Sequence, residues 1–483
     1  MRCVVQRFDF KAFEPQNAQM LKFPLRSRQV EGIGIVHANE AGRFFATAEG
    51  AALGSVAAHA FLLDNGHAAD GANTLQADSH ELQVLARDTV AGELDYLILV
   101  PTLRCNLSCS YCQVSRADAS AAGYDWSDET LSAVLAMLDR LSTDSIKIEF
   151  QGGEPTLRLD LVRAVIERCD RFSFKQFVIC TNLSELSDEL RALLARPDVS
   201  LSTSLDGDAL VHSNQRTKDT QATQRFFGNL RSVLNEFGSG KVSALPTIDQ
   251  ANPPPIDSLI ESYWAFGFRS IYLRPINYQG FARKRHPGSR DDHAQWWTYY
   301  DAFVARLIER NFADRSQVLE ESYLSLCLRR IFRIGLDRHV DLRNPNPVGV
   351  DYVVIDYDGR VYPTDEARML TRSGVVDLCI GDVWQGFESE ARRTLDAHST
   401  THGDPACDAC LYQPFCGRDL IDDLSRYGRI DLPRHDTFFC RKHLHLFDLC
   451  MRLIYSDDPA TSYSLAKWLG LAGDALPRQA KLV

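Results

Sequence analysis

Strand-like and helix-like segments alternate between residues 94 and 276, and this alternation constrains the fold more than any other feature of the chain. Six short runs are rich in β-branched and other apolar residues, at 94–100, 146–150, 176–180, 199–205, 241–245 and 270–273. The segments between them carry apolar residues at helical spacing, as in 127–142. Such alternation is typical of a parallel sheet with helical crossovers, so we expect an α/β fold.

The sequence divides into five expected parts. Residues 1–90 hold short β-like runs and one helix-compatible run, which indicates a small N-terminal α+β segment; the alternating part follows at 91–280. Residues 281–350 have helical spacing and are expected to form a connector. A Cys-rich part at 351–455 opens on Asp358-Gly359 between apolar runs, a strong hairpin signal. Residues 456–483 complete the chain as a tail.

Composition excludes several classes of protein. The chain has 483 residues, 45% of them hydrophobic, and a formal net charge of −11, which disfavours binding to nucleic acid. No run of 18 apolar residues occurs, so no membrane span is expected. The first residues lack the order of a signal peptide. We therefore expect a cytoplasmic protein whose 13 cysteines serve metal binding or catalysis rather than disulfides.

Three cysteines follow the first predicted strand within eight residues. Cys105, Cys109 and Cys112 have the spacing C-x3-C-x2-C. Three thiolates can hold three irons of a [4Fe–4S] cluster and leave the fourth iron open, as a catalytic centre requires. The alternatives are buried cysteines in a turn or a zinc site. Zinc favours a fourth ligand, and no other Cys or His lies within ten residues of this loop.

The loop resembles the signature of the radical S-adenosylmethionine (SAM) superfamily, in which an aromatic residue, here Tyr111, precedes the last cysteine. Further matches follow the second, third and fourth predicted strands, at Gly152, Gly153, Glu154, Asn182, Ser204, Asp206 and Arg216. In relatives these positions contact SAM. The resemblance implies a partial (β/α)6 TIM-like barrel, a [4Fe–4S] cluster and SAM as cofactors, and an iron–sulfur oxidoreductase that cleaves SAM to a 5′-deoxyadenosyl radical.

A second set of cysteines lies near the C-terminus, at Cys407, Cys410, Cys416 and Cys440. The set resembles the SPASM extension of peptide-modifying radical SAM enzymes, which binds two auxiliary clusters. Its outer ligand set is complete here, whereas Thr364 and Leu420 stand where relatives have ligands of the inner cluster. We therefore predict a single auxiliary [4Fe–4S] cluster. A structural zinc site is the alternative.

Two acids, Asp365 and Glu366, follow Thr364 directly. They are weak catalytic candidates that either act on substrate or lie solvated at the end of the predicted hairpin. The solvated interpretation is the one that we favour from sequence, and the catalytic residues of the chain are otherwise unassigned.

Within the superfamily, the contexts of Cys105–Cys112 and of Pro363–Ala367 resemble the B-type maturase of the His-Xaa-Ser repeat system. This resemblance implies a ribosomally made peptide as substrate, a second radical SAM maturase as partner, and an electron donor such as flavodoxin or ferredoxin. We expect residues 1–90 to help bind the peptide by strand addition. The alternatives are an anaerobic sulfatase-maturating-type oxidase of protein residues and a non-catalytic zinc or iron–sulfur scaffold.

Overall fold

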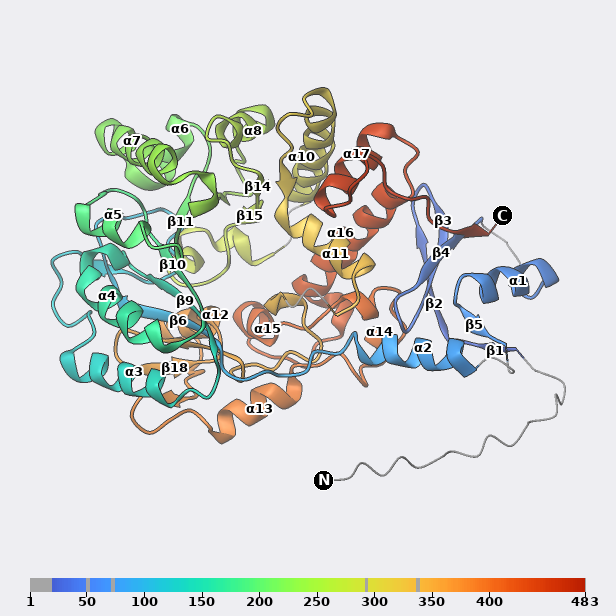
Figure 1. The fold of residues 1–483 in the computed structure, drawn as a ribbon, viewed down its shortest axis with the longest axis horizontal. Helices are drawn as coiled ribbons and strands as arrows, with labels where there is room; N and C mark the ends of the chain where they lie inside the picture. Colours follow the sequence, from blue (N-terminus) through green and yellow to red (C-terminus); the bar gives the residue numbers. More distant parts are fainter. Residues whose placement is uncertain (1–19, 49–52, 71–73, 292–293, 336–338, 483) are drawn as a thin grey trace.

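The computed structural model describes residues 20–48, 53–70, 74–291, 294–335 and 339–482. Figure 1 shows an α/β half around one large sheet, a layer of helices beside it, and a small sheet at the opposite end that joins N-terminal strands to the last strand. Among the described residues, no helix has the length and apolar character needed to cross a membrane.

The large sheet confirms the expected α/β class. Five parallel strands lie in the order β12-β11-β10-β9-β6: β6 (Tyr96–Thr102), β9 (Ser145–Gly152), β10 (Phe174–Cys180), β11 (Val199–Ser204) and β12 (Val242–Leu245). The main helices between them are α3 (Asp128–Arg140), α4 (Leu159–Arg168), α5 (Asp188–Leu194) and α7 (Thr220–Phe237). The first five expected strands are present, with ends that differ by a few residues, and α3 lies within the helix expected at 127–142.

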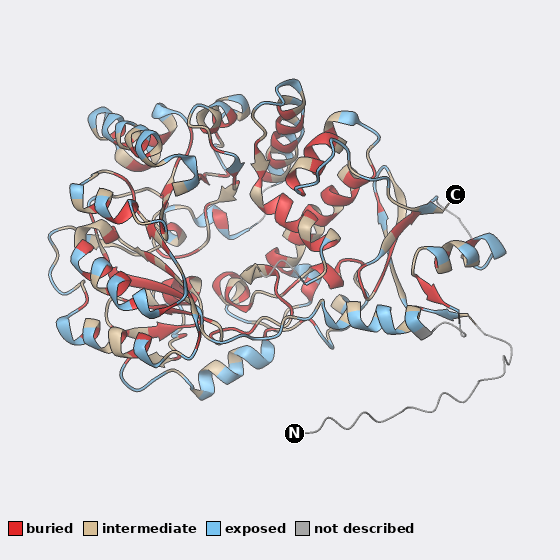
Figure 2. Cartoon of the chain, viewed as in Figure 1, coloured by how far each residue is buried: buried red, intermediate tan, exposed pale blue. Residues whose placement is uncertain are grey.

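Alternation along the strands separates the core from the concave face. In β9, Ile146, Ile148 and Phe150 are buried in the main hydrophobic core, whereas Glu149 and Gln151, at the intervening positions, line cavities. Side chains two residues apart point to the same face of a strand, so one face packs and the other remains available for ligands. Figure 2 shows the buried residues gathered along these strands and the exposed ones on the outer helices.

The sixth expected strand differs from the prediction. Residues 270–275 form two short strands, β14 (Ser270–Ile271) and β15 (Arg274–Pro275), that do not join the large sheet. β15 instead pairs in parallel with β13 (Thr247–Ile248), which follows β12 after Pro246. Proline has no N–H to donate, so the ladder breaks at this point and the sheet continues as a separate parallel pair.

The other edge of the sheet is extended by the C-terminal part. β17 (Tyr352–Ile355) pairs in parallel with β6 and in antiparallel fashion with β18 (Arg360–Tyr362), as the Asp358-Gly359 signal predicts for the hairpin. β19 (Gly381–Asp382) completes the order. The Cys-rich part is therefore anchored directly beside the strand that leads into the three-cysteine loop.

Helices and a small sheet complete the molecule. The helices α10 (Ala294–Ala313), α11 (Ser322–Phe332), α16 (Phe438–Ile454) and α17 (Pro459–Trp468) form the layer in the middle of Figure 1. The small sheet has the order β2-β3-β4-β20, with β2 (Leu25–Val30), β3 (Gly34–Asn39), β4 (Phe44–Thr47) and β20 (Lys481–Leu482). Helices α1 (Val56–Asp64) and α2 (Thr74–Leu85) follow β4 and complete the N-terminal segment.

Candidate active site

The three-cysteine loop starts where β6 ends. Asp125 fixes its base: the carboxylate accepts hydrogen bonds from Thr102 Oγ1 (2.5 Å) and Arg104 (2.6 and 2.8 Å), and from Arg158 Nη1 (2.9 Å). Burial opposes the charge of Asp125, yet these bonds hold the pKa of its carboxyl below the ordinary value. One carboxylate thus joins the entry of the loop to the turn that follows the Gly-Gly-Glu segment.

A cavity of about 350 Å³, here called the three-cysteine cavity, brings most of the predicted residues together. Its lining includes Cys105, Cys109, Tyr111, Cys112, Gly152, Gly153, Asn182, Ser204 and Arg216. Burial raises the pKa of the Cys105 thiol to about 12 and also raises that of Cys109. Thiols become thiolates when a metal supplies the compensating charge, and three of them lining one cavity fit an iron–sulfur cluster with a free coordination position.

Gly152 and Gly153 serve close packing of the chain. Gly152 has φ +119°, and a Cβ on it would collide with the carbonyl of Thr102. A Cβ on Gly153 would collide with the carbonyls of Leu103 and Arg104. The two glycines therefore let the end of β9 lie directly against the start of the cysteine loop, while both still line the cavity.

Glu154 lies behind the cavity wall and is 1% exposed. Its carboxylate accepts hydrogen bonds from the backbone N–H and hydroxyl of Thr156 (3.2 and 2.7 Å) and from the N–H of Asn182 (2.7 Å). Asn182 in turn donates to Asn106 Oδ1 (2.8 Å) inside the cysteine loop. Glu154 therefore connects the second motif to the third and orients a residue that contacts the first.

Tyr111, Asp206 and Arg216 form a buried network. The Tyr111 hydroxyl donates to Asp206 Oδ2 (2.6 Å) and accepts from Arg216 Nη1 (2.6 Å), and Asp206 also accepts from the N–H of Thr247 (2.9 Å). Arg216 lies on a π-helical turn (Ser213–Thr217), a geometry frequent at functional sites. This turn also meets the loop, because Ser110 N–H donates to the Gln215 carbonyl (3.0 Å).

The C-terminal cysteines line a second cavity of about 260 Å³, here called the four-cysteine cavity. Cys407 lies in α14 (Pro405–Asp408), Cys440 in α16, and Cys410 and Cys416 between them. Arg28 of the N-terminal segment also lines this cavity and forms a bidentate pair with Asp448 at 2.8 Å. Burial raises the pKa of the Cys407 thiol to about 12 and that of Cys440 to about 11.

Metal geometry is not preformed in the described ranges, where no three Cys, His, Asp or Glu side chains converge on a point that could hold a single metal ion. The four thiols nevertheless share one cavity and supply the ligand type that iron–sulfur clusters and structural zinc both use.

A third cavity, of about 340 Å³ and here called the acidic cavity, adjoins the three-cysteine cavity; Gln113, Gln151 and Arg274 line both. Its acids are Asp341, Asp365, Glu366, Asp419 and Asp422. Asp365 and Glu366 start α12 (Asp365–Arg372), and Asp365 is 8% exposed, so the expectation of solvated acids at a hairpin end is wrong. The hairpin ends at Tyr362, and the chain turns inward to begin a helix that carries both acids into the interior.

Sequence reasoning missed Gln113, Arg274 and Asp419. Arg274 follows the sixth strand-like run, so its position at a strand end was the one available signal. Asp419 and Gln113 carry no recognisable motif. Their proximity to the site results from the packing of α15 (Leu420–Tyr427) and of the cysteine loop.

Comparison with known proteins matches residues 99–233 to the family model described as Radical SAM superfamily. An uncharacterized protein of Methanocaldococcus jannaschii is 26% identical over 185 residues, 37% of this chain and 61% of that protein. A GTP 3′,8-cyclase of Peptoclostridium acidaminophilum is 35% identical over 121 residues, 24% of this chain and 37% of the cyclase. The matched segment thus covers between about a third and two thirds of these relatives.

Solved structures share the fold over a longer range. The structure of anSMEcpe with bound AdoMet has a TM-score of 0.57 at 16% identity and covers 73% of this chain and 96% of that one. A structure of anSMEcpe with bound AdoMet and Cp18Cys peptide has a TM-score of 0.56 at 15% identity, covering 74% and 96%. Residues 99–233 therefore resemble a radical SAM domain, and the longer match to the solved structures shows a shared fold. The domain match, together with the similarity to GTP 3′,8-cyclases, indicates an enzyme.

Proposed function

We propose that the chain is a peptide maturase that binds SAM at a [4Fe–4S] cluster held by Cys105, Cys109 and Cys112. The observation that carries this proposal is the three-cysteine cavity, where three thiols lie beside Gly152, Gly153, Ser204 and Arg216. When bound, the cluster and SAM supply reductive cleavage to a 5′-deoxyadenosyl radical that abstracts hydrogen from a substrate carbon. The chain's own residues orient SAM and exclude water.

Arg216 supplies a fixed positive charge in this cavity. Its guanidinium is 9% exposed and is held by the Tyr111 hydroxyl, so it meets an anionic group without reorganisation. The SAM carboxylate has the charge and shape that a guanidinium binds best. Asn182 and Ser204 offer hydrogen bonds at the neighbouring strand ends.

A peptide substrate is proposed on two grounds. The acidic cavity opens from the three-cysteine cavity and gives a substrate group access to the SAM site. In addition, anSMEcpe, which has this fold, is described with bound AdoMet and a peptide. Within this class we favour the His-Xaa-Ser type maturase with a second radical SAM maturase as partner, a flavodoxin or ferredoxin as electron donor, and a cytoplasmic location.

We also propose that Cys407, Cys410, Cys416 and Cys440 bind one auxiliary [4Fe–4S] cluster, and that residues 1–90 contribute to peptide binding. A sulfatase-maturating-type oxidase shares the fold and remains the second candidate, while a scaffold with zinc in both Cys sets is the third. Anaerobic metal analysis separates the scaffold from the enzymes. Two clusters require about eight irons and eight sulfides per chain, whereas zinc without sulfide indicates the scaffold.

The direct test is anaerobic reconstitution with SAM and dithionite, followed by measurement of 5′-deoxyadenosine. The parent protein is expected to form it, and Cys105→Ala is expected to lose it. Cys169→Ala is the matched control, because Cys169 is buried at the end of α4 and lines none of the three cavities. An equal yield from Cys105→Ala contradicts the proposal. Candidate repeat peptides, added to the active enzyme and followed by mass, then address the substrate.

A further inference from the structure

The acidic cavity lies beside the three-cysteine cavity, and the proposal for SAM binding gives it no role. Gln113, Gln151 and Arg274 belong to both linings, so a group in the acidic cavity lies next to the SAM pocket. Its far wall comes from the C-terminal part, through α12, α15 and the start of α16. A substrate that reaches the SAM pocket therefore meets side chains of the C-terminal part.

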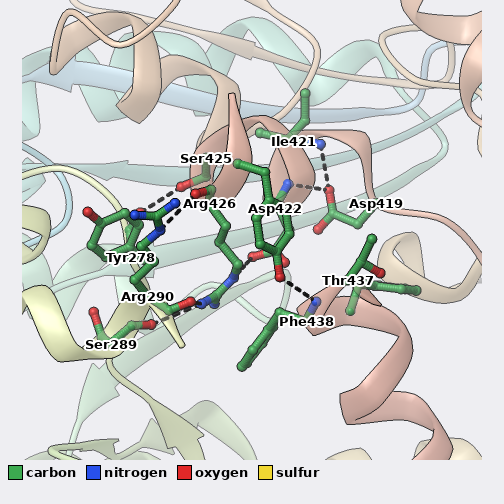
Figure 3. Close-up of polar contacts among 12 residues, drawn as sticks. Tyr278, Ser289, Arg290, Asp419, Ile421, Asp422, Ser425, Arg426, Thr437 and Phe438 are labelled. Carbon is green, nitrogen blue, oxygen red and sulfur yellow. Dashed lines mark hydrogen bonds and ion pairs between the residues drawn. The ribbon is translucent and has the colours of Figure 1, made fainter. Parts of the chain in front are cut away.

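The cations in this wall are already matched to acids or other groups. Arg426 donates to Asp422 Oδ1 (2.8 Å) and to the backbone carbonyl of Ser289 (2.9 Å), an arrangement that Figure 3 shows. Lys442 lies over the ring of Tyr323 at 4.3 Å. Asp365 has its own cation, since Arg368 Nε donates to its Oδ1 at 2.8 Å from outside the cavity lining.

Asp341 lies 3.6 Å from His339 Nε2, which leaves two acids of the lining without a basic partner among the described residues. Neither Glu366 nor Asp419 forms an ion pair with any residue that the structure describes. The first turn of α15 fixes Asp419, whose Oδ1 accepts from the N–H groups of Ile421 (2.9 Å) and Asp422 (3.0 Å), as Figure 3 shows. Burial raises the pKa of both carboxyls, and the charge of Glu366 contributes to the rise at Asp419. Both carboxyls line the acidic cavity, so both face a group that binds there.

Buried acceptors without donors supply a second, independent indication of a ligand. Gln250 and Gln279 line the same cavity at 6% and 4% exposure, and the side-chain oxygen of each is buried without a hydrogen-bond partner. Asp422 Oδ2 is a third such oxygen. An unpaired buried acceptor is costly, so a cavity lined by several of them is complementary to a group that carries several N–H donors.

Aromatic rings also line the cavity, with Tyr272, Trp296 and Tyr352 among them. Such rings pack against an alkyl stem and attract a cation over their faces. We propose that the acidic cavity binds a positively charged side chain, lysine or arginine, of the peptide substrate, with Glu366 and Asp419 as its counter-charges. The inference rests on the proposed function for its peptide. It assigns a binding role to the two segments, around Thr364 and Leu420, that lack the cysteines of the inner cluster.

The test measures binding rather than turnover. The protein is reconstituted anaerobically, saturated with SAM, and titrated with N-acetyl-lysine methylamide or its norleucine counterpart, with saturation-transfer NMR as the readout. We expect the lysine probe to bind at least tenfold more tightly. Glu366→Gln and Asp419→Asn should each weaken it at least fivefold without changing norleucine binding or SAM binding. Glu390→Gln, at an exposed acid in the first turn of α13 (Glu390–His398), should bind like the parent.

Equal binding of the two probes, or unchanged lysine binding in both cavity variants, overturns the inference. Formation of 5′-deoxyadenosine is measured in the same preparations. SAM cleavage without preferential lysine binding removes the assignment of the cavity and leaves the proposed function standing. Preferential lysine binding without SAM cleavage supports the assignment of the cavity and contradicts the proposed function.

Discussion

Glu366 shows how a single side chain is placed at a cost to stability. It occupies the first turn of α12, where burial and the charges of Asp365 and Asp341 raise the pKa of its carboxyl to about 7 from an ordinary value of 4.5. The folded chain therefore favours the protonated acid more than the unfolded chain does. As pH rises from 4.5 to 7, the free energy of unfolding falls, and it stays lower above pH 7.

Removing this charge should stabilise the protein at high pH. Glu366→Gln cannot ionise, so we expect it to be more stable than the parent at pH 8, by up to about 3 kcal/mol, with a much smaller difference at pH 5. Chemical denaturation at both pH values measures the effect. Glu390→Gln, at an exposed site, should show no pH-dependent difference. A Glu366→Gln variant less stable than the parent at pH 8 contradicts this account of the side chain.

At the scale of elements, Asp125 joins the cysteine loop to its surroundings. Its side chain is 21% exposed, and it receives hydrogen bonds from Thr102, Arg104 and Arg158, which lie at the end of β6, in the loop entry and after the Gly-Gly-Glu segment. Without the carboxylate, the guanidinium groups of both arginines lose an acceptor. The entry of the loop then keeps its short pairing with β8 (Ala117–Asp118), and the loop itself keeps its hydrogen bonds to Gln215 and Asn182.

Asp125→Ala should destabilise this junction by about 1–3 kcal/mol, because it leaves part-buried charged donors without their partner. We also expect faster loss of iron from the three-cysteine site during anaerobic dialysis against a chelator. Asp128→Ala, at the first turn of α3, is the control and should lose iron like the parent. Equal rates of iron loss in Asp125→Ala and the parent would show that the loop does not depend on this carboxylate.

Elements of the barrel could be predicted from sequence because their signals are local. Ser127 and Ser187 cap α3 and α5 by accepting from the N–H groups of Thr130 and Leu190, and such caps mark helix starts. The pairing of β6 with β17 could not be predicted. This pairing places Leu97 opposite Val353, more than 250 positions away in the sequence. An apolar run indicates a strand but does not indicate which strand pairs with it.

The candidate site divides in the same way. The three-cysteine cavity could be predicted because its residues follow successive strands of one parallel sheet. The acidic cavity could not be predicted. Glu366 and Asp419 lie at the starts of two helices of the C-terminal part, and neither segment has a sequence pattern that indicates how these helices pack. The sequence singles out Asp365 together with Glu366, and only the structure separates them: Asp365 is paired with Arg368, whereas Glu366 has no cation among the residues that the structure describes.

At the scale of the whole molecule, the N-terminal segment packs against the part of the chain that carries the C-terminal cysteines. Arg28 of β2 pairs with Asp448 of α16, which also accepts from the Tyr412 hydroxyl (2.6 Å). The strand β20, near the C-terminus, pairs with β4 in the same small sheet (Figure 1). Ser27 and Arg28 of β2 therefore line the four-cysteine cavity, and β20 belongs to the sheet that carries them.

Arg28→Ala should make the four-cysteine cavity more accessible to solvent. The pair is partly exposed, so we expect a loss of about 1 kcal/mol in stability, together with faster loss of iron from the four-cysteine site. Arg163→Ala, which removes an exposed pair with Glu189 on the barrel, is the control. Iron retention by Arg28→Ala equal to that of the control would show that the N-terminal segment does not protect this site.

The central claim is an open iron at the three-cysteine loop that binds SAM, and electron paramagnetic resonance tests it most directly. The measurement uses a Cys407→Ala/Cys410→Ala variant, so that signals from the C-terminal cysteines do not interfere. After anaerobic reduction, this variant should show a [4Fe–4S] signal that changes when SAM is added, and the signal should vanish when Cys105→Ala is introduced as well. A signal that does not change when SAM is added, or one that is still present in the Cys105→Ala variant, would contradict the account.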